Sequence, residues 1–239
     1  MKKIAICAAA VAAMLTSCQQ NQTTNAAEGT ESVETHILHA QDVEPLTPDQ
    51  VVELLKKGNE AFVHHTTHNR DAVAQLKESA HDGQHPLAIV LSCIDARVPV
   101  ELIFDKGVGD LFVTRVAGNV VSGDILGSME YACGHSGSKV VVVMGHKQCG
   151  AVHSACEGAH GGNLTDMLAK INPAIEEMKT KGCNLEELEG QNMVARQNAL
   201  NMVEAVRQGS EELREMEAAG KIKIVAAMFD LETGEVEFL

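Results

Sequence analysis

Two apolar segments of this chain each lead directly into residues that can bind a metal ion. The run Leu87–Leu91 is followed by Cys93, and the run Val140–Met144 is followed by His146 and Cys149. Short runs rich in β-branched residues are typical of buried strands in a parallel sheet. The carboxyl ends of such strands meet at one edge of the sheet, where open α/β folds bind their ligands. We therefore expect the three side chains to lie close together.

The same reasoning along the chain predicts an α/β domain with a mostly parallel central β-sheet flanked by helices. Strands are expected at about 87–92, 110–116, 139–145 and 222–229, and helices near 123–136, 150–158, 164–180 and 186–208. An earlier amphipathic helix should begin at Pro48, because Thr47 and Gln50 form a capping-box pattern around it.

The three candidate ligands form an incomplete zinc site. A structural Zn²⁺ normally takes four protein ligands, whereas a catalytic Zn²⁺ takes three and leaves one position for water. Cys93, His146 and Cys149 supply two thiolates and one imidazole, so the sequence predicts a reactive Zn²⁺ site. Asp95 and Arg97 lie immediately after Cys93. They add a carboxylate and a guanidinium that can pair beside the metal.

Four sequence blocks, in order and in spacing, resemble β-class carbonic anhydrases. They are Ser92–Pro99, Asp110–Asn119, Gly127–Ala132 and Val143–Val152. The resemblance runs from about Leu46 to the C-terminus and has the plant-type active-site pattern. It implies the β-carbonic anhydrase fold and a zinc lyase, carbonate dehydratase. Such an enzyme reversibly hydrates carbon dioxide to bicarbonate and a proton by means of a zinc-bound hydroxide.

The resemblance also implies roles for individual residues. Asp95, held by Arg97, orients the hydroxide, and in some family members this aspartate moves onto the metal in a closed form at low pH. Gln84 resembles a glutamine that reaches into the partner subunit's site to bind substrate oxygen; the alternative is a glutamine in a surface loop. Gly150 either lets the backbone approach the substrate closely or only starts the next helix.

An inhibitory bicarbonate pocket, found in some bacterial members, is expected to be absent. Arg115 stands where the arginine of that pocket would be, but Val90 replaces its tryptophan, and residues 221–229 contain no tyrosine.

Other functions remain open at this point. A carbon disulfide or carbonyl sulfide hydrolase would use the same fold, and a non-enzymatic zinc-binding module would need Asp95 locked on the metal as a fourth ligand. A redox protein would use a Cys-x-x-Cys pair, which the sequence lacks. His64, His65 and His68 could form a second metal site or a proton relay, or simply a solvated helix end.

The N-terminus has the features of an export signal. Residues 1–17 contain Lys2 and Lys3, an apolar stretch and small residues before a break. Leu15–Cys18 resembles a bacterial lipobox, which implies lipidation of Cys18; the alternative is an ordinary cleaved leader. Polar residues 18–45 are expected to be a disordered tether, followed by the catalytic domain at 46–239. These features predict an exported protein, lipid-anchored in the bacterial cell envelope on its periplasmic face or at the cell surface.

Charge and the resemblance together narrow the partners. The formal net charge is −14, and removal of the leader with its two lysines makes it more negative. Such a surface repels nucleic acid, which excludes that class of partner. The expected partners are carbon dioxide and bicarbonate, the membrane through the lipid anchor, and further copies of the chain in a homodimer or tetramer. In the resembling family the N-terminal helix packs on a partner subunit.

Overall fold

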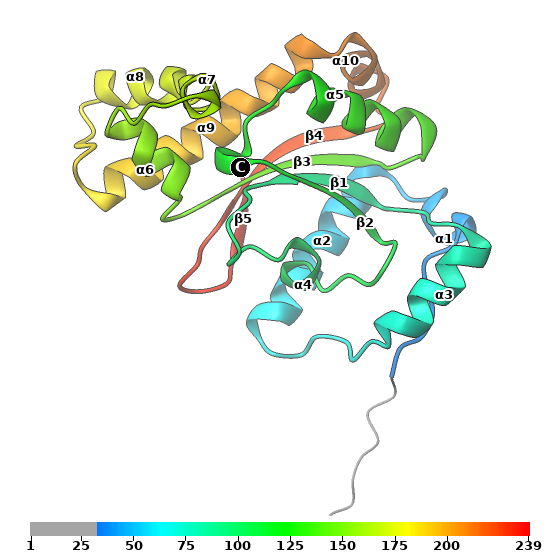
Figure 1. Ribbon diagram of the computed structural model, residues 1–239. Helices are drawn as coiled ribbons and strands as arrows, with labels where there is room; N and C mark the ends of the chain where they lie inside the picture. The colour runs from blue at the N-terminus through cyan, green and yellow to red at the C-terminus, as the bar shows by residue number, and fades with distance from the viewer. Residues whose placement is uncertain (1–32) are drawn as a thin grey trace, which may run out of the picture. The chain divides into compact units, whose positions relative to one another are not determined.

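The computed structural model describes residues 33–239 as one folded unit. The expected signal peptide, Cys18 and the tether up to residue 32 lie outside the described residues. A five-stranded sheet in the order β2-β1-β3-β4-β5 forms the centre (Figure 1). Its strands are β1 (Ala88–Ser92), β2 (Leu111–Arg115), β3 (Val140–His146), β4 (Lys223–Phe229) and β5 (Val236–Phe238).

Strands β1 to β4 are parallel, and β5 pairs antiparallel with β4. This arrangement confirms the predicted mostly parallel sheet, and each of the four predicted strands lies where it was expected. The chain passes from β1 to β2 on one side and then returns to place β3 on the other side of β1. The topological switch point therefore lies between the carboxyl ends of β1 and β3, where ligands are bound in such sheets.

Successive strand residues face opposite sides of the sheet, and the chain buries an apolar core on each side. Ile89, Leu91 and Val143 belong to one core, whereas Val90 and Val142 belong to the other. The first core is covered by α5, α9 and α10, and the second by α2 and α4 (Figure 1). These helices are α2 (Pro48–Val63), α4 (Val100–Ile103), α5 (Gly123–Glu130), α9 (Leu188–Gly209) and α10 (Glu211–Ala218).

Helix α2 begins where the capping box predicts. The Thr47 side chain accepts the N–H of Gln50 at 3.2 Å, and the Gln50 side chain accepts the N–H of Thr47 at 2.8 Å. Val51 and Leu55 of this helix pack in the chain's own core. The expected contact with a partner subunit therefore concerns the remaining surface of the helix and stays a prediction.

The expectation of a disordered tether up to residue 45 is wrong for residues 33–45. Glu34 forms a β-bridge with Arg70, Ile37 and Val43 are buried, and α1 (Ala40–Val43) is a short helix. The N-terminal boundary of the folded part is therefore earlier than Leu46, because Val43 of this segment packs in the second core, the one that α2 covers.

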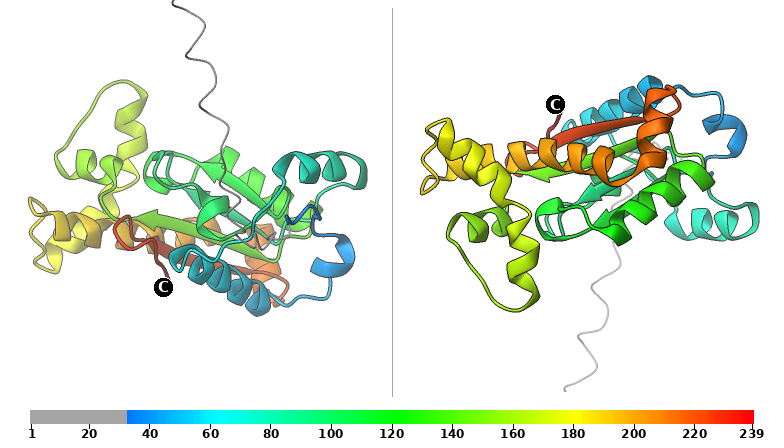
Figure 2. Two further views of the ribbon diagram at one scale, coloured as in Figure 1. Left: turned by 90° about the horizontal axis from the view of Figure 1, so that it is seen from below. Right: turned by 90° about the horizontal axis from the view of Figure 1, so that it is seen from above.

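The predicted helices occur in the expected order, but the helix expected at 164–180 is two helices, α7 (Asn163–Ala169) and α8 (Asn172–Thr180). Four α-helices in the described part of the chain were not predicted, namely the short α1 and α4, α10 and α3 (Ala72–Asp82). Helix α6 (Gly150–Cys156) follows β3, and a π-helical turn (Tyr131–His135) extends α5. Figure 2 shows α7 and α8 projecting beyond the sheet on the side away from α3. Within residues 33–239, no helix combines the length and apolar character needed to cross a membrane.

Candidate metal centre

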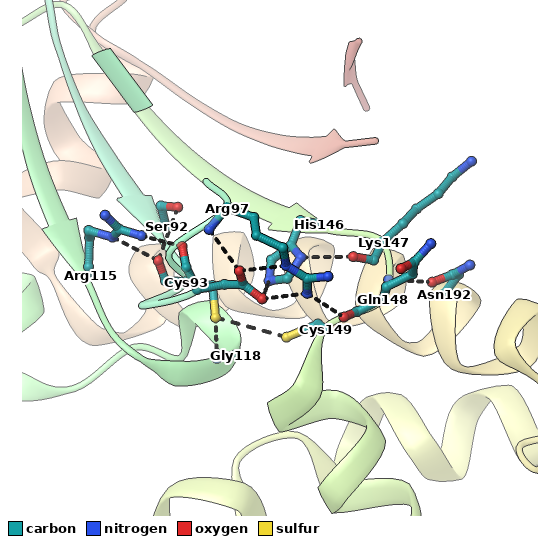
Figure 3. Close-up of polar contacts among 11 residues, drawn as sticks. Ser92, Cys93, Arg97, Arg115, Gly118, His146, Lys147, Gln148, Cys149 and Asn192 are labelled. Atoms are coloured by element: carbon teal, nitrogen blue, oxygen red, sulfur yellow. Dashed lines mark hydrogen bonds and ion pairs between the residues drawn. The ribbon is translucent and has the colours of Figure 1, made fainter. Parts of the chain in front are cut away.

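Three buried side chains meet at the switch point. Cys93 directly follows β1, His146 is the last residue of β3, and Cys149 is the N-cap of α6. One ligand atom from each residue lies within 4.8 Å of the other two, and the two Sγ atoms are 4.0 Å apart (Figure 3). The predicted ligands are therefore brought together. Among residues 33–239 they form the single tight group of three or more potential metal ligands.

His146 is oriented for metal binding by its own backbone. Its Nδ1 lies 2.8 Å from the carbonyl oxygen of Lys147, so Nδ1–H donates to that carbonyl and Nε2 carries a free lone pair. Nε2 is buried and has no hydrogen-bond partner. Buried polar atoms without partners are rare in native proteins. Two sulfur donors beside an orphaned imidazole nitrogen are the ligands that Zn²⁺ prefers, so the residues present fit this ion.

The two thiols differ in acidity. The pKa of Cys93 is lowered, chiefly because the Cys149 thiol donates to its sulfur, with further donation from the N–H of Gly118 at 3.4 Å. The pKa of Cys149 is raised, chiefly because its thiol donates a hydrogen bond to Cys93 that ionisation would remove, and further because the thiol is buried and lies beside the negative charge of Cys93. A divalent cation removes this conflict by pairing with both thiolates, and its binding would release protons.

Asp95 and Arg97 form the predicted pair beside the ligands. Arg97 donates to Asp95 through its backbone N–H and Nε, both 2.9 Å from Oδ1, and through Nη2, 2.7 Å from Oδ2. These hydrogen bonds hold the pKa of the Asp95 carboxyl well below its usual range. Asp95 Oδ2 lies 3.9 Å from His146 Nε2. The carboxylate thus faces the position that a metal ion would occupy while it remains bonded to the guanidinium.

Arg115 holds the backbone of this loop. Its Nε donates to the carbonyl oxygen of Cys93 at 2.9 Å, and its Nη2 donates to the carbonyl oxygen of Asp95 (Figure 3). Val90, which stands where the tryptophan of the inhibitory pocket would be, is fully buried in the second core, the one that α2 covers. In this chain the Arg115 guanidinium is used to fix the backbone of the ligand loop.

Sequence reasoning missed two further residues at the site. Gln148, between the ligands His146 and Cys149, has a φ of 55°, and its N–H donates to the Asn192 side-chain oxygen at 2.9 Å. Asn192 belongs to α9, far from the motifs in sequence. The sequence does not indicate a positive φ at Gln148, because glycine is the usual residue in that conformation. It does not indicate the contact with Asn192 either, because the two residues are far apart in the chain.

Other predicted residues lie in different places. Gln84 precedes the amino end of β1, is exposed beside Gly109, and does not meet the three ligands within this chain. Gly150 is the first residue of α6, and apart from its chain neighbours and its own helix backbone a Cβ there would meet no atom within 4 Å, so this position faces open space. His68 pairs with the buried carboxylate of Asp105 at 2.6 Å. His64, His65 and His68 do not form a tight metal-binding group in the described part of the chain.

Comparisons with known proteins agree with this geometry. The family model for carbonic anhydrase matches residues 88–236. The chain is 32% identical to the carbonic anhydrase 2 of Mycobacterium tuberculosis over 185 residues, which is 75% of this chain and 87% of the relative. It is 33% identical to the carbonic anhydrase of Mycolicibacterium smegmatis over 190 residues, 77% of this chain and 89% of that protein.

Solved structures give the same result for the fold. A tetrameric β-carbonic anhydrase of Sordaria macrospora superimposes with a TM-score of 0.63 at 25% identity, covering 80% of this chain and 97% of that one. A β-carbonic anhydrase of Aspergillus fumigatus gives a TM-score of 0.61 at 22% identity, covering 80% and 89%. With the family model, the relatives and the buried Cys-His-Cys group in agreement, the chain belongs to the β-carbonic anhydrase family.

Proposed function

We propose that this protein catalyses the reversible hydration of carbon dioxide to bicarbonate and a proton, with Zn²⁺ held by Cys93, His146 and Cys149. One observation carries the proposal. The orphaned Nε2 of His146 lies beside two buried thiols and near a carboxylate that Arg97 holds in place. Three protein donors leave one coordination position open, which is the arrangement of a catalytic site.

When bound there, Zn²⁺ supplies the nucleophile by lowering the pKa of a water molecule. Asp95 would orient this nucleophile. As an ionised carboxylate it can only accept hydrogen bonds, so it would accept the hydrogen of the nucleophile and leave the oxygen lone pair free for the carbon of the substrate. Arg97 keeps Asp95 ionised and fixes its rotamer through the two side-chain hydrogen bonds. The open space at Gly150 lets the substrate approach the backbone beside Cys149.

The position of Asp95 favours catalysis over a non-enzymatic zinc module. A structural site would need Asp95 as the fourth ligand, but three hydrogen bonds from Arg97 hold its carboxylate. In the closed form at low pH, Asp95 would leave Arg97 and bind the metal. That form would be a regulated state of the enzyme.

The substrate also separates this proposal from hydrolysis of carbon disulfide or carbonyl sulfide. Stopped-flow measurement of proton release from carbon dioxide, repeated with each sulfur substrate, tests it directly. We expect carbon dioxide to give much the highest kcat/KM. A faster reaction with carbon disulfide than with carbon dioxide would overturn the assignment.

We assign Gln84 to a neighbouring subunit's site. Its place at the amino end of β1, opposite to the end that carries Cys93, supports contact with substrate only across a subunit interface. This role requires a homodimer or a tetramer, in which the free surface of α2 would contact the partner. Sedimentation analysis of the purified domain gives the assembly.

We also propose that the protein is exported and lipid-anchored in the cell envelope. The support is the sequence of residues 1–18, in which Leu15–Cys18 resembles a lipobox. A diacylated and N-acylated Cys18 would carry more than one acyl chain, and stable anchoring needs more than one. Wild-type protein should partition with membranes and into detergent, and Cys18→Ala protein should not. Wild-type protein found wholly soluble with an N-terminus free of lipid would rule out the anchor and leave the enzyme assignment intact.

A further inference from the structure

Gln148 has a backbone conformation that its own side chain does not favour. Its φ is 55°, in the left-handed region, and it stands between Lys147 and the ligand Cys149. For a residue with a Cβ this conformation costs free energy, so it persists only where the surroundings hold it. The contacts of Gln148 with its neighbours must therefore compensate for this strain.

Two neighbours hold Gln148. Asn192 on α9 accepts the Gln148 N–H through Oδ1 at 2.9 Å, and the Gln148 side chain donates to Glu232 at 3.0 Å (Figure 3 shows the first contact). Gln148 and Asn192 are both half-buried. Leaving the Gln148 N–H without an acceptor at such a place would cost free energy. The hydrogen bond to the Asn192 oxygen therefore stabilises the left-handed conformation of Gln148.

The same residue also connects to the catalytic pair. The Gln148 carbonyl accepts Arg97 Nη2 at 3.3 Å, and that nitrogen also donates to Asp95 Oδ2 at 2.7 Å. The next residue is Cys149, whose sulfur lies 4.0 Å from that of Cys93. A rotation of the backbone at Gln148 would therefore move a ligand and remove an acceptor from Arg97.

We propose that Asn192 is a positioning residue of the metal centre. It holds Gln148 in the left-handed conformation, which directs the Cys149 thiolate toward the metal position and the Gln148 carbonyl toward Arg97. The effect on hydration rate rests on the proposed function. The effect on metal binding does not, because it follows from the ligand geometry alone.

Asn192→Ala removes the acceptor. We expect the dissociation constant for Zn²⁺, measured by competition with a chelator, to rise about 10-fold, as is usual when a group that orients metal ligands is lost. The charge-transfer spectrum of the Co²⁺-substituted protein should change, because it reports thiolate geometry. The kcat for hydration should fall by a similar factor with KM unchanged, and the pH–rate profile should shift.

Three further variants separate positioning from a general loss of structure. Asn192→Asp keeps an oxygen acceptor and should restore the Co²⁺ spectrum and most of the Zn²⁺ affinity. Gln148→Gly adopts a positive φ without help, so adding Asn192→Ala to it should change neither quantity further. Asn201→Ala is the control, because Asn201 lies on the same helix and accepts a hydrogen bond only from Gln197 within it.

The proposal is overturned if Asn192→Ala matches Asn201→Ala in Zn²⁺ affinity, Co²⁺ spectrum and pH profile. It is equally overturned if Asn192→Ala weakens metal binding by the same factor in the wild-type and Gln148→Gly backgrounds, since the effect would then not pass through Gln148. Wild-type protein that fails to hydrate carbon dioxide would refute the proposed function, and the metal measurements would still decide the role of Asn192.

Discussion

Replacing Asp95 by asparagine should separate catalysis from metal binding. The carboxylate accepts two donors at Oδ1, the backbone N–H and Nε of Arg97, and one at Oδ2, Nη2 of Arg97. The asparagine oxygen will occupy the Oδ1 position, where two donors converge. Its NH₂ group must then take the Oδ2 position, facing Arg97 Nη2 and the metal position near His146 Nε2.

The magnitude follows from this exchange of an acceptor for a donor. One charge-assisted hydrogen bond, worth about 1.5–3 kcal/mol, is lost, and the group that should accept from the nucleophile now donates. Each 1.36 kcal/mol corresponds to a factor of ten in rate. We therefore expect kcat to fall at least about 10-fold and up to about 100-fold, in the range usual for groups that orient a metal site. Zinc content should stay near the wild-type value, because Asp95 is outside the ligand group.

The assay is stopped-flow hydration together with zinc analysis of the same samples. Asp166→Asn is the control, because it makes the same change of charge at an exposed position on α7. Arg97→Ala should give a similar loss of rate by freeing the carboxylate. Wild-type rates for both Asp95→Asn and Arg97→Ala would refute the orienting mechanism, and a loss of rate in proportion to lost zinc would show that Asp95 is a ligand.

Three other outcomes follow from the fold and the site. Gln84→Ala should raise KM or lower kcat without loss of zinc, and an unchanged kcat/KM would place Gln84 in an ordinary surface loop. Gly58→Ala in α2, ordinarily favourable in a helix by about 1 kcal/mol, should instead destabilise by about 1–3 kcal/mol. A Cβ there would lie 1.8 Å from the carbonyl oxygen of Phe104, and urea unfolding checks the sign. Arg207 donates to Glu217 at 2.8 and 2.9 Å and lowers the pKa of that carboxyl. This stabilisation is complete above the unfolded pKa of about 4.3 and is lost as pH falls through the lower folded value. The stability gap between wild type and Glu217→Gln should therefore narrow below about pH 4.3 and be constant near neutrality.

The strands and the metal ligands could be predicted because both follow from local pattern. The buried runs before Cys93 and His146 have no polar residue to interrupt them, and parallel strands place their carboxyl ends together. The split of the helix expected at 164–180 also had a signal, Pro173, which has no N–H to donate to the carbonyl of Ala169 four residues earlier and so interrupts a continuous helix. Pro173 lies in the first turn of α8, as expected for this residue.

Helix α3 could not be predicted from periodicity because it buries a polar side chain and exposes apolar ones. Gln75 is buried and donates to the carbonyl of His36, while Val73 and Leu76 are 61% and 59% exposed. The pattern of apolar residues therefore does not mark the face that packs. The contact between Asn192 and Gln148 likewise could not be predicted, since a residue on α9 meets Gln148 only through the tertiary fold.

The most direct test of the whole account is zinc content measured alongside carbon dioxide hydration in wild type and Cys149→Ser. Cys149 is a buried thiol, 4.0 Å from Cys93 and within the ligand group, and a hydroxyl is a poor substitute for a thiolate as a ligand of Zn²⁺. Wild type should hold about one zinc per chain, the number that three protein ligands and one open position imply, and should hydrate carbon dioxide rapidly. The variant should lose most of the zinc and the activity together. A Cys149→Ser protein with stoichiometric zinc and wild-type hydration would contradict the assignment of the metal centre.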